Sequence, residues 1–328
     1  MGKLNKTVVS VITAVAGVPI LAGCYAGYQK LRYSRSAKAG LTELYLNNKY
    51  KKFKDIDEKK RLEQQKANNA EELIDISKVE INSSIITKNK DDRAIWYLNS
   101  NSDSNIAILY IHGGSYVHNL ADVQWQLADK VALETNAEVI IPDYGLAPFY
   151  TYKDSYKLIT DLYTEYLKEN PEKTIYIMGD SAGGGLALGI VQNFVKNGTP
   201  LPKGLILLSP WVDLTMKNPE IKKYIKKDPL LSIEALLADA FSWAGDKDLA
   251  DWMISPINGN LEGLPKVLLF TGTRELIYPD TVILADKLKS AGVNTTFEIG
   301  KNLNHVYPAF PIPEAKVAIE KIADFVKK

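Results

Sequence analysis

One pentapeptide of the chain has the form that places a reactive serine on a tight turn. Ser181 is the central residue of G-D-S-A-G at 179–183, which follows an apolar run at 175–178 and precedes a helical pattern. A G-x-S-x-G sequence between a strand and a helix is typical of a sharp turn that exposes the serine hydroxyl. A serine hydroxyl becomes a good nucleophile when a base removes its proton. The pattern therefore predicts Ser181 as a nucleophile.

The base must be one of only three histidines, at positions 112, 118 and 305. When a serine lies on such a strand–turn–helix, the nucleophile, the acid and the histidine follow one another in that order along the chain. Only His305 follows Ser181, in a loop between the last expected strand and the last expected helix. We therefore predict His305 as the general base. We interpret His112 as a residue that shapes its loop, and His118 as a surface or lid residue.

An acidic residue is expected to orient the imidazole of His305 and to stabilise its protonated form. Glu275 follows the apolar run 267–270 and fits this place. Asp280 is the alternative, although it follows Pro279 and precedes an apolar helical stretch, as a helix N-cap does. The placement favours Glu275.

A third segment, H-G-G-S at 112–115, follows the apolar run 106–111. Glycines let the backbone pass close to a reacting carbonyl, and backbone N–H groups aimed at the developing oxyanion lower the barrier. The N–H groups of Gly113 and Gly114 are the predicted donors. The N–H of Ala182, at the start of the helix after Ser181, is the predicted third donor.

The chain must bring these segments together, and its pattern of apolar runs indicates how. Apolar strands separated by helices are typical of a mostly parallel sheet covered by helices on both faces. Residues 79–86 and 93–98 are expected to form an opening hairpin, and 211–265 an insertion over the carboxyl edge, where such sheets bind ligands. The expected strands are 106–111, 139–141, 175–178, 205–208, 267–270 and 295–299, and the expected helices are 121–134, 152–168, 182–196, 281–290 and 314–327.

The N-terminus predicts attachment to a membrane. Residues 7–28 carry no charged side chain and are long enough to cross the hydrocarbon core. One interpretation is a bacterial lipoprotein signal, in which Cys24, the only cysteine, follows Leu-Ala-Gly and is lipidated after cleavage. The other is an uncleaved anchor, because apolar residues continue past Cys24 and basic residues follow closely. A buried core helix fits less well, because the segment is terminal. The predicted division is an anchor or signal at 1–29 and an α/β domain at 30–328.

Composition excludes several classes of protein. The 328 residues contain 40 Lys and Arg against 39 Asp and Glu, a balance that argues against a nucleic-acid partner. A single cysteine excludes an intrachain disulfide framework and a multi-thiolate zinc site. Residues 36–75 lack proline and carry apolar side chains at helical spacing, which predicts one or two amphipathic helices.

These segments together resemble the hormone-sensitive-lipase-like family of α/β hydrolases, in its bacterial carboxylesterase branch. The resemblance covers about residues 79–328 and rests on Y-I-H-G-G-S at 110–115, D-Y-G-L-A-P at 143–148, G-D-S-A-G-G at 179–184, L-S-P-W-V-D at 208–213 and N-H-V-Y-P at 304–308. It implies an α/β-hydrolase fold and hydrolysis of small or short-acyl esters through an acyl-enzyme, with no metal or cofactor. It also implies a helical cap formed by segments near 36–75 and 213–255. Glu275 stands where the family usually has aspartate, and Phe149 and Tyr150 stand where it commonly has glutamate.

The resemblance and the apolar N-terminus together predict a membrane-anchored serine carboxylesterase, with a small-molecule ester as substrate and membrane lipid as partner. We expect it on the bacterial cytoplasmic membrane, with the catalytic domain on the outer side. A deacetylase of acetylated carbohydrate or cell-wall material would use the same residues. A non-catalytic ligand receptor on the same fold is the alternative of another class, and loss of Ser181 or His305 would favour it; both are present. A purely structural surface protein would leave the three glycine-rich segments unexplained.

Overall fold

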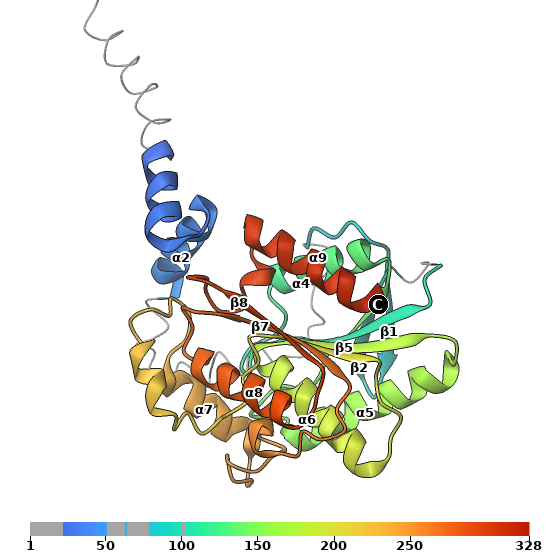
Figure 1. The fold of residues 1–328 in the computed structure, drawn as a ribbon. Coiled ribbons are helices and arrows are strands. Elements are labelled where there is room, and N and C mark those ends of the chain that lie inside the picture. The colour runs from blue at the N-terminus through green and yellow to red at the C-terminus, as the bar shows by residue number, and fades with distance from the viewer. Residues whose placement is uncertain (1–21, 51–62, 64–78, 100–102, 328) are drawn as a thin grey trace, which may run out of the picture.

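The computed structural model describes residues 22–50, 63, 79–99 and 103–327, and Figure 1 shows their arrangement. Eight strands form one sheet in the order β1-β2-β4-β3-β5-β6-β7-β8. Strand β2 runs antiparallel to both of its neighbours, and β3 to β8 pair in parallel. The strands are β1 Ile85–Lys90, β2 Arg93–Leu98, β3 Ile106–Ile111, β4 Glu138–Pro142, β5 Thr174–Asp180, β6 Gly204–Leu208, β7 Lys266–Gly272 and β8 Thr295–Gly300.

Helices cover both faces of this sheet. Helices α4 and α9 lie on one face, and α5, α6 and α8 lie on the other, with α7 beyond them (Figure 1). The α-helices are α2 Ala37–Tyr50, α4 Asp122–Thr135, α5 Tyr152–Glu169, α6 Ser181–Asn197, α7 Ile233–Ala244, α8 Tyr278–Ser290 and α9 Pro313–Lys327, and the short 3₁₀ helices are η3 Pro219–Lys223, η4 Pro256–Asn258 and η5 Tyr307–Ala309.

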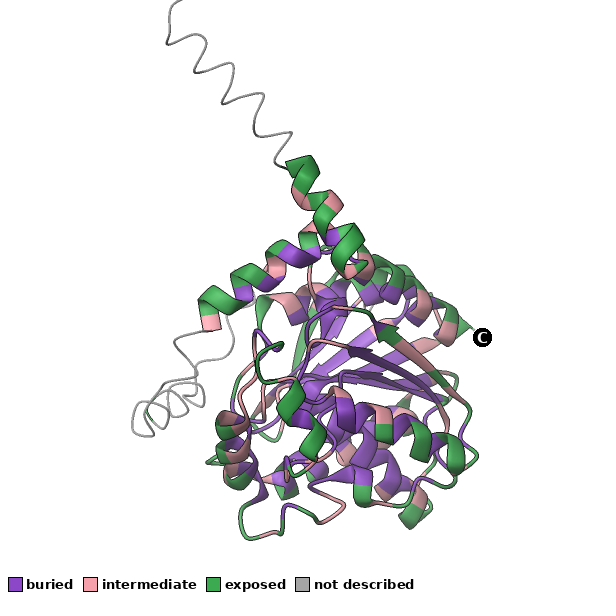
Figure 2. Ribbon diagram, turned by 60° about the vertical axis from the view of Figure 1, so that its left-hand side comes forward, coloured by how far each residue is buried: buried purple, intermediate pink, exposed green. Residues whose placement is uncertain are grey.

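The central strands are apolar throughout because each contributes to two cores. In β3, Leu109 and Ile111 belong to the core under α5 and α6, whereas Ile108 and Tyr110 belong to the core under α4 and α9. Successive side chains of a strand point to opposite faces, so a strand covered on both sides needs apolar residues at every position. Figure 2 shows the buried residues concentrated on the sheet and on the inner faces of the helices.

The expected hairpin has a different first strand from the one predicted. We predicted 79–86, but β1 is Ile85–Lys90, a largely exposed edge strand. The turn falls at Asp91 and Asp92, whose φ values of 50° and 59° are typical of a two-residue hairpin turn. Val79 and Ile81 still pack against the core without being part of a strand. The other predicted strands and helices agree with the structure to within three residues.

The two predicted cap segments are described to different extents. Within 213–255 the chain forms η3 and α7, and Trp243 of α7 is fully buried in the core. Within 36–75, residue 36 precedes α2, which covers 37–50, and residues 51–75 apart from residue 63 lie outside the described residues.

The N-terminal prediction is described only in part. Of the apolar segment 7–28, residues 1–21 lie outside the described part, and 22–28 begin a helix that continues to residue 33. Cys24 is exposed on this helix. In the described part of the chain, no helix combines the length and the apolar character needed to span a membrane.

Candidate active site

Ser181 is the first residue of α6 and follows β5 directly, as predicted. Its φ of 51° lies in the left-handed region, which a non-glycine residue adopts at a cost of about 1–3 kcal/mol. The turn is possible because Gly183 lets α6 approach β3: a Cβ there would lie 2.1 Å from the carbonyl oxygen of Ile111. The turn thereby places Ser181 between the carboxyl end of β5 and the body of α6.

The structure brings His305 and Glu275 to this serine from two other loops. His305 Nε2 lies 2.8 Å from Ser181 Oγ, and His305 Nδ1 lies 2.5 Å from Glu275 Oε2. The other Glu275 oxygen accepts hydrogen bonds from the Thr271 hydroxyl and, at 2.9 Å, from the Gly272 N–H. These contacts fix the carboxylate so that it faces the imidazole. In this geometry the imidazole can accept the hydroxyl proton while the carboxylate stabilises the imidazolium.

The electrostatic environment of His305 favours its protonated form. Burial lowers the pKa of the imidazole, but the hydrogen bond and the charge of Glu275 outweigh it, and Asp228 and Asp180 add to their effect. The net result is a His305 pKa above the usual 6.5.

Backbone contacts hold the two loops that carry this pair. The Arg274 N–H donates to the Leu303 carbonyl at 3.0 Å, and the Val306 N–H donates to the Ser209 hydroxyl at 3.0 Å. A Cβ at Gly272 would lie 2.4 Å from the Leu303 carbonyl oxygen. Glycine at the end of β7 therefore allows two loops to pack backbone against backbone: the loop after β7, which carries Glu275, and the loop after β8, which carries His305.

The structure does not support Gly113 as an oxyanion donor. Its N–H already donates to Asp180 Oδ1 at 2.9 Å. Gly114 and Ser115 follow with φ values of 126° and 53°, and within the described residues their N–H groups and that of Ala182 have no partner in the protein. The free donors are thus Gly114, Ser115 and Ala182. Sequence reasoning missed Ser115, although it is the next residue of the same H-G-G-S segment.

Asp180 connects the H-G-G-S loop to the turn of the serine. Besides Gly113, it accepts from the Tyr110 hydroxyl at 2.6 Å and from Gln124 Nε2 at 2.9 Å. Burial raises the pKa of this carboxyl, although these hydrogen bonds act in the opposite direction. Asp180 therefore braces the loop, a role that the G-x-S-x-G pattern does not specify.

The remaining two histidines agree with the roles expected for them. His112 is fully buried, its Nδ1 lies 2.7 Å from the Gly113 carbonyl oxygen, and its ring stacks on Tyr144 with centroids 4.4 Å apart. Burial lowers the His112 pKa to about 4, so the ring is neutral near pH 7. His118 is exposed.

Asp280 is separate from the imidazole and is not an N-cap. It is the third residue of α8, where it is buried and accepts a hydrogen bond from Asn218 Nδ2 at 2.7 Å. Burial raises its pKa to about 6. The geometry thus places Glu275, and not Asp280, in contact with His305.

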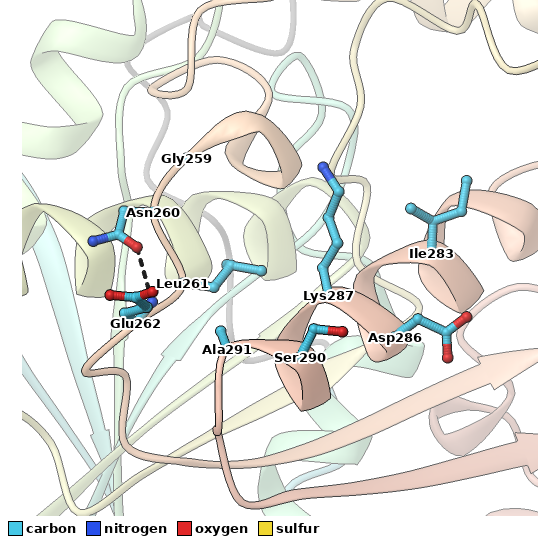
Figure 3. Close-up of a pocket in the computed structure, with 9 residues that line it drawn as sticks. All are labelled: Gly259, Asn260, Leu261, Glu262, Ile283, Asp286, Lys287, Ser290 and Ala291. Carbon is cyan, nitrogen blue, oxygen red and sulfur yellow. Dashed lines mark hydrogen bonds between the residues drawn. The ribbon is translucent and has the colours of Figure 1, made fainter.

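A surface pocket of about 460 Å³ lies at a different place, beside α8 (Figure 3). Its lining combines the loop after η4 with one face of α8, and Lys287 there donates to the Ile257 carbonyl. None of the residues around Ser181 lines it: the pocket is formed by Gly259, Asn260, Leu261, Glu262, Ile283, Asp286, Lys287, Ser290 and Ala291.

Known proteins are similar to this chain in sequence and in fold. The model of the family described as the alpha/beta hydrolase fold matches residues 108–309. An esterase of Acinetobacter venetianus is 34% identical over 222 residues, which are 66% of this chain and 73% of the relative. An acetyl-hydrolase of Streptomyces hygroscopicus is 29% identical over 223 residues, 67% of this chain and 75% of the relative.

Solved structures of esterases have the same fold as this chain. A candidate esterase from Staphylococcus aureus superposes with a TM-score of 0.79 at 30% identity, over 84% of this chain and 95% of that one. An esterase from the bacterial hormone-sensitive lipase family superposes with a TM-score of 0.72 at 26% identity, over 76% and 85% of the two chains. The fold and these relatives define a carboxylester hydrolase. The chain belongs to the hormone-sensitive-lipase-like family of α/β hydrolases.

Proposed function

We propose that the protein is a serine carboxylesterase in which Ser181, His305 and Glu275 form the catalytic triad. The observation that carries the proposal is the continuous chain of contacts from the Ser181 hydroxyl through the His305 imidazole to the Glu275 carboxylate. All three side chains are at least 90% buried within the folded protein. A preorganised and largely dry site strengthens such polar contacts.

The proposed reaction has two half-reactions. His305 Nε2 takes the hydroxyl proton as Ser181 Oγ attacks the ester carbonyl carbon, and the oxyanion is stabilised by the N–H groups of Gly114, Ser115 and Ala182. The ester C–O bond then breaks, and the alcohol leaves with the proton from His305. Water, deprotonated by the same imidazole, then attacks the acyl carbon on Ser181. The bond from this carbon to Ser181 Oγ breaks, His305 returns the proton to Ser181 Oγ, and the carboxylic acid is released.

Aromatic packing beside the serine supports a short acyl group. The Trp211 N–H donates to the Ser181 carbonyl at 2.8 Å, and the Tyr116 ring stacks on Trp243 with centroids 3.7 Å apart. Tyr116 and Trp211 also stack on each other, at 5.9 Å. These three rings are fully buried, and the Tyr116 hydroxyl lies 3.3 Å from the position that a Cβ at Gly185 of α6 would take. The acetyl-hydrolase relative supports the same preference.

A deacetylase acting on acetylated carbohydrate or cell-wall material is the second candidate. It uses the same triad and the same small acyl group, and differs only in the alcohol portion. The similarity to an acetyl-hydrolase supports this candidate, which is a more specialised form of the same esterase activity.

We also propose that residues 1–29 attach the enzyme to the bacterial cytoplasmic membrane, with residues 30–328 on the outer side. The uncharged run 7–28, with basic residues on both flanks, supports this. If Cys24 is lipidated, Cys24→Ala abolishes metabolic palmitate labelling and blocks signal cleavage. If the segment is an uncleaved anchor, the same variant behaves like the parent protein, and removal of residues 1–21 releases it from membranes.

Hydrolysis of p-nitrophenyl esters from acetate to palmitate tests the enzymatic proposal. The full chain in detergent is expected to turn over acetate and butyrate fastest, and Ser181→Ala to be inactive while its unfolding temperature is retained. Turnover by Ser181→Ala near the parent level contradicts the nucleophile assignment. Folded parent protein that is inactive on every chain length but releases acetate from acetylated oligosaccharides is the specialised deacetylase.

A further inference from the structure

The N-terminal arm, defined as residues 22–50, packs beside the loops that carry Glu275 and His305. It consists of the helix at 22–33 and α2, and Figure 1 shows α2 next to the ends of β7 and β8. The acid loop follows β7, and the histidine loop follows β8. The arm therefore lies at the side of the site where the triad is assembled.

A nearly buried group of three charges joins the arm to the acid loop. One oxygen of Glu43 binds Arg35 within the arm, and the other accepts a hydrogen bond from Arg274 Nη2 at 2.6 Å. The side chains of Arg35, Glu43 and Arg274 are only 5%, 12% and 18% exposed. Arg274 directly precedes Glu275 in the chain. Glu43 thus connects the arm to the residue next to the catalytic carboxylate.

The same arm also holds the histidine loop. Arg35 Nη1 donates to the Asn302 carbonyl at 2.8 Å, and Asn302 Nδ2 donates to the Tyr33 carbonyl at 2.9 Å. The Asn302 N–H in turn donates to the Thr273 hydroxyl at 2.8 Å. Asn302 lies three positions before His305, so one end of the arm contacts both loops at once.

From these contacts we propose that Glu43 is a positioning residue, which sets the separation of Glu275 and His305 through Arg274 and Arg35. Glu43 lies between two guanidinium groups and pairs with both. Removal of its charge leaves two poorly solvated cations without their anionic partner, and such charges reorganise the surrounding structure. A displacement of about 1 Å at a triad can reduce a rate by roughly a hundredfold. This inference rests on the proposed function of the triad and adds that the N-terminal arm positions two of its members.

The test compares Glu43→Gln with Glu314→Gln in the full chain. Glu314 is the matched control because it accepts from the N–H and the hydroxyl of Ser36 and so fastens the same arm to α9 instead of to the catalytic loops. Glu43→Gln is expected to reduce kcat on p-nitrophenyl acetate roughly tenfold or more with little change in KM. Glu314→Gln is expected to keep kcat within about twofold.

The pH profile separates positioning from a general loss of stability. The groups that face His305 are Ser181, Glu275, Asp228 and Asp180, and the contact with Glu275 raises the imidazole pKa. A looser contact in Glu43→Gln lowers that pKa, so the acid limb of kcat/KM moves to lower pH. Arg274→Gln removes a cation, which by charge alone would move the limb to higher pH. A shift to lower pH in both variants therefore identifies positioning.

A spectroscopic measurement keeps the inference testable whatever the esterase activity is. With only three histidines, ¹⁵N-histidine labelling resolves the Nδ1–H of His305 as a downfield proton signal in the contact with Glu275. We expect this signal to move upfield or broaden in Glu43→Gln and to be unchanged in Glu314→Gln. An unchanged signal in Glu43→Gln, or equal changes in both variants, overturns the inference. Inactive parent protein whose signal still responds to Glu43→Gln contradicts the proposed function alone.

Discussion

The carboxyl edge of the sheet and the N-terminal arm are built in different ways. At the edge, Ser181 and the H-G-G-S loop directly follow their strands, and close backbone contacts at Gly183 and Gly272 fix their geometry. The arm reaches the body through charged and polar side chains, such as the contact of Arg35 with Asn302, 267 positions away. Two backbones in close contact leave almost no room for either to move. An ion pair between distant segments forms only when the fold brings its two side chains together. Backbone packing thus fixes the geometry of the carboxyl edge, whereas the arm influences the position of the Glu275 and His305 loops through side-chain contacts.

The largest expected effect comes from removing the base at the edge. His305→Ala is expected to lower kcat by about 10⁵-fold or more, because among the described residues His305 is the base in contact with the Ser181 hydroxyl. Steady-state hydrolysis of p-nitrophenyl acetate measures this. His118→Ala is the matched control and should retain parent activity, because His118 is exposed. Comparable losses in the two variants would falsify the assignment of the base.

Replacement of the acid tests whether Glu275 or Asp280 orients the imidazole. Glu275→Gln is expected to reduce kcat roughly 10³- to 10⁴-fold, because the amide no longer stabilises the imidazolium. Asp280→Asn should change kcat by less than about threefold, since Asp280 contacts Asn218 instead of His305. The opposite ranking of the two variants would exchange their roles.

A pair of glycine substitutions compares the rigidity of the two regions directly. In Gly183→Ala the new Cβ meets the Ile111 carbonyl at 2.1 Å, and we expect a loss of about 3 kcal/mol or more in the free energy of unfolding. In Gly40→Ala the nearest atoms belong to the Tyr25 and Gln29 side chains, which can move. Because alanine also favours a helix by about 1 kcal/mol, this variant should unfold within about 1 kcal/mol of the parent. Urea unfolding distinguishes the two, and equal losses would mean that the arm is as rigid as the edge.

The smallest expected effect is a pH dependence set by His305. Only the neutral imidazole can accept the Ser181 proton, and its pKa is raised above 6.5 in the folded protein. Activity should therefore be lost as the pH falls through a midpoint above 6.5, measured as kcat/KM on an uncharged ester. His112, with a pKa of about 4, remains neutral throughout this range and should not contribute. A midpoint near pH 4 would point to His112 instead.

The sequence allowed most of the fold and most of the candidate site to be predicted because their signals are local. The apolar run before Ser181 and the glycines around it are contiguous, and the order of Ser181, Glu275 and His305 along the chain needs no alignment. The hydrogen bond of the Gly113 N–H to Asp180 could not be predicted, because the direction of a single N–H depends on the local backbone conformation and on the position of a buried carboxylate. The start of β1 was missed because a partly apolar stretch can be buried without belonging to a strand.

The sequence by itself determined which residues could carry the chemistry: a serine on a tight turn, one histidine in the right order, and a short choice of acids. Only the tertiary structure decided that Glu275 faces His305, that Ser115 replaces Gly113 as a free donor, and that Glu43 lies between Arg35 and Arg274. The reason is physical. Local patterns specify backbone conformation and burial, whereas pairing between side chains distant in sequence depends on how whole elements pack, and periodicity does not encode that packing.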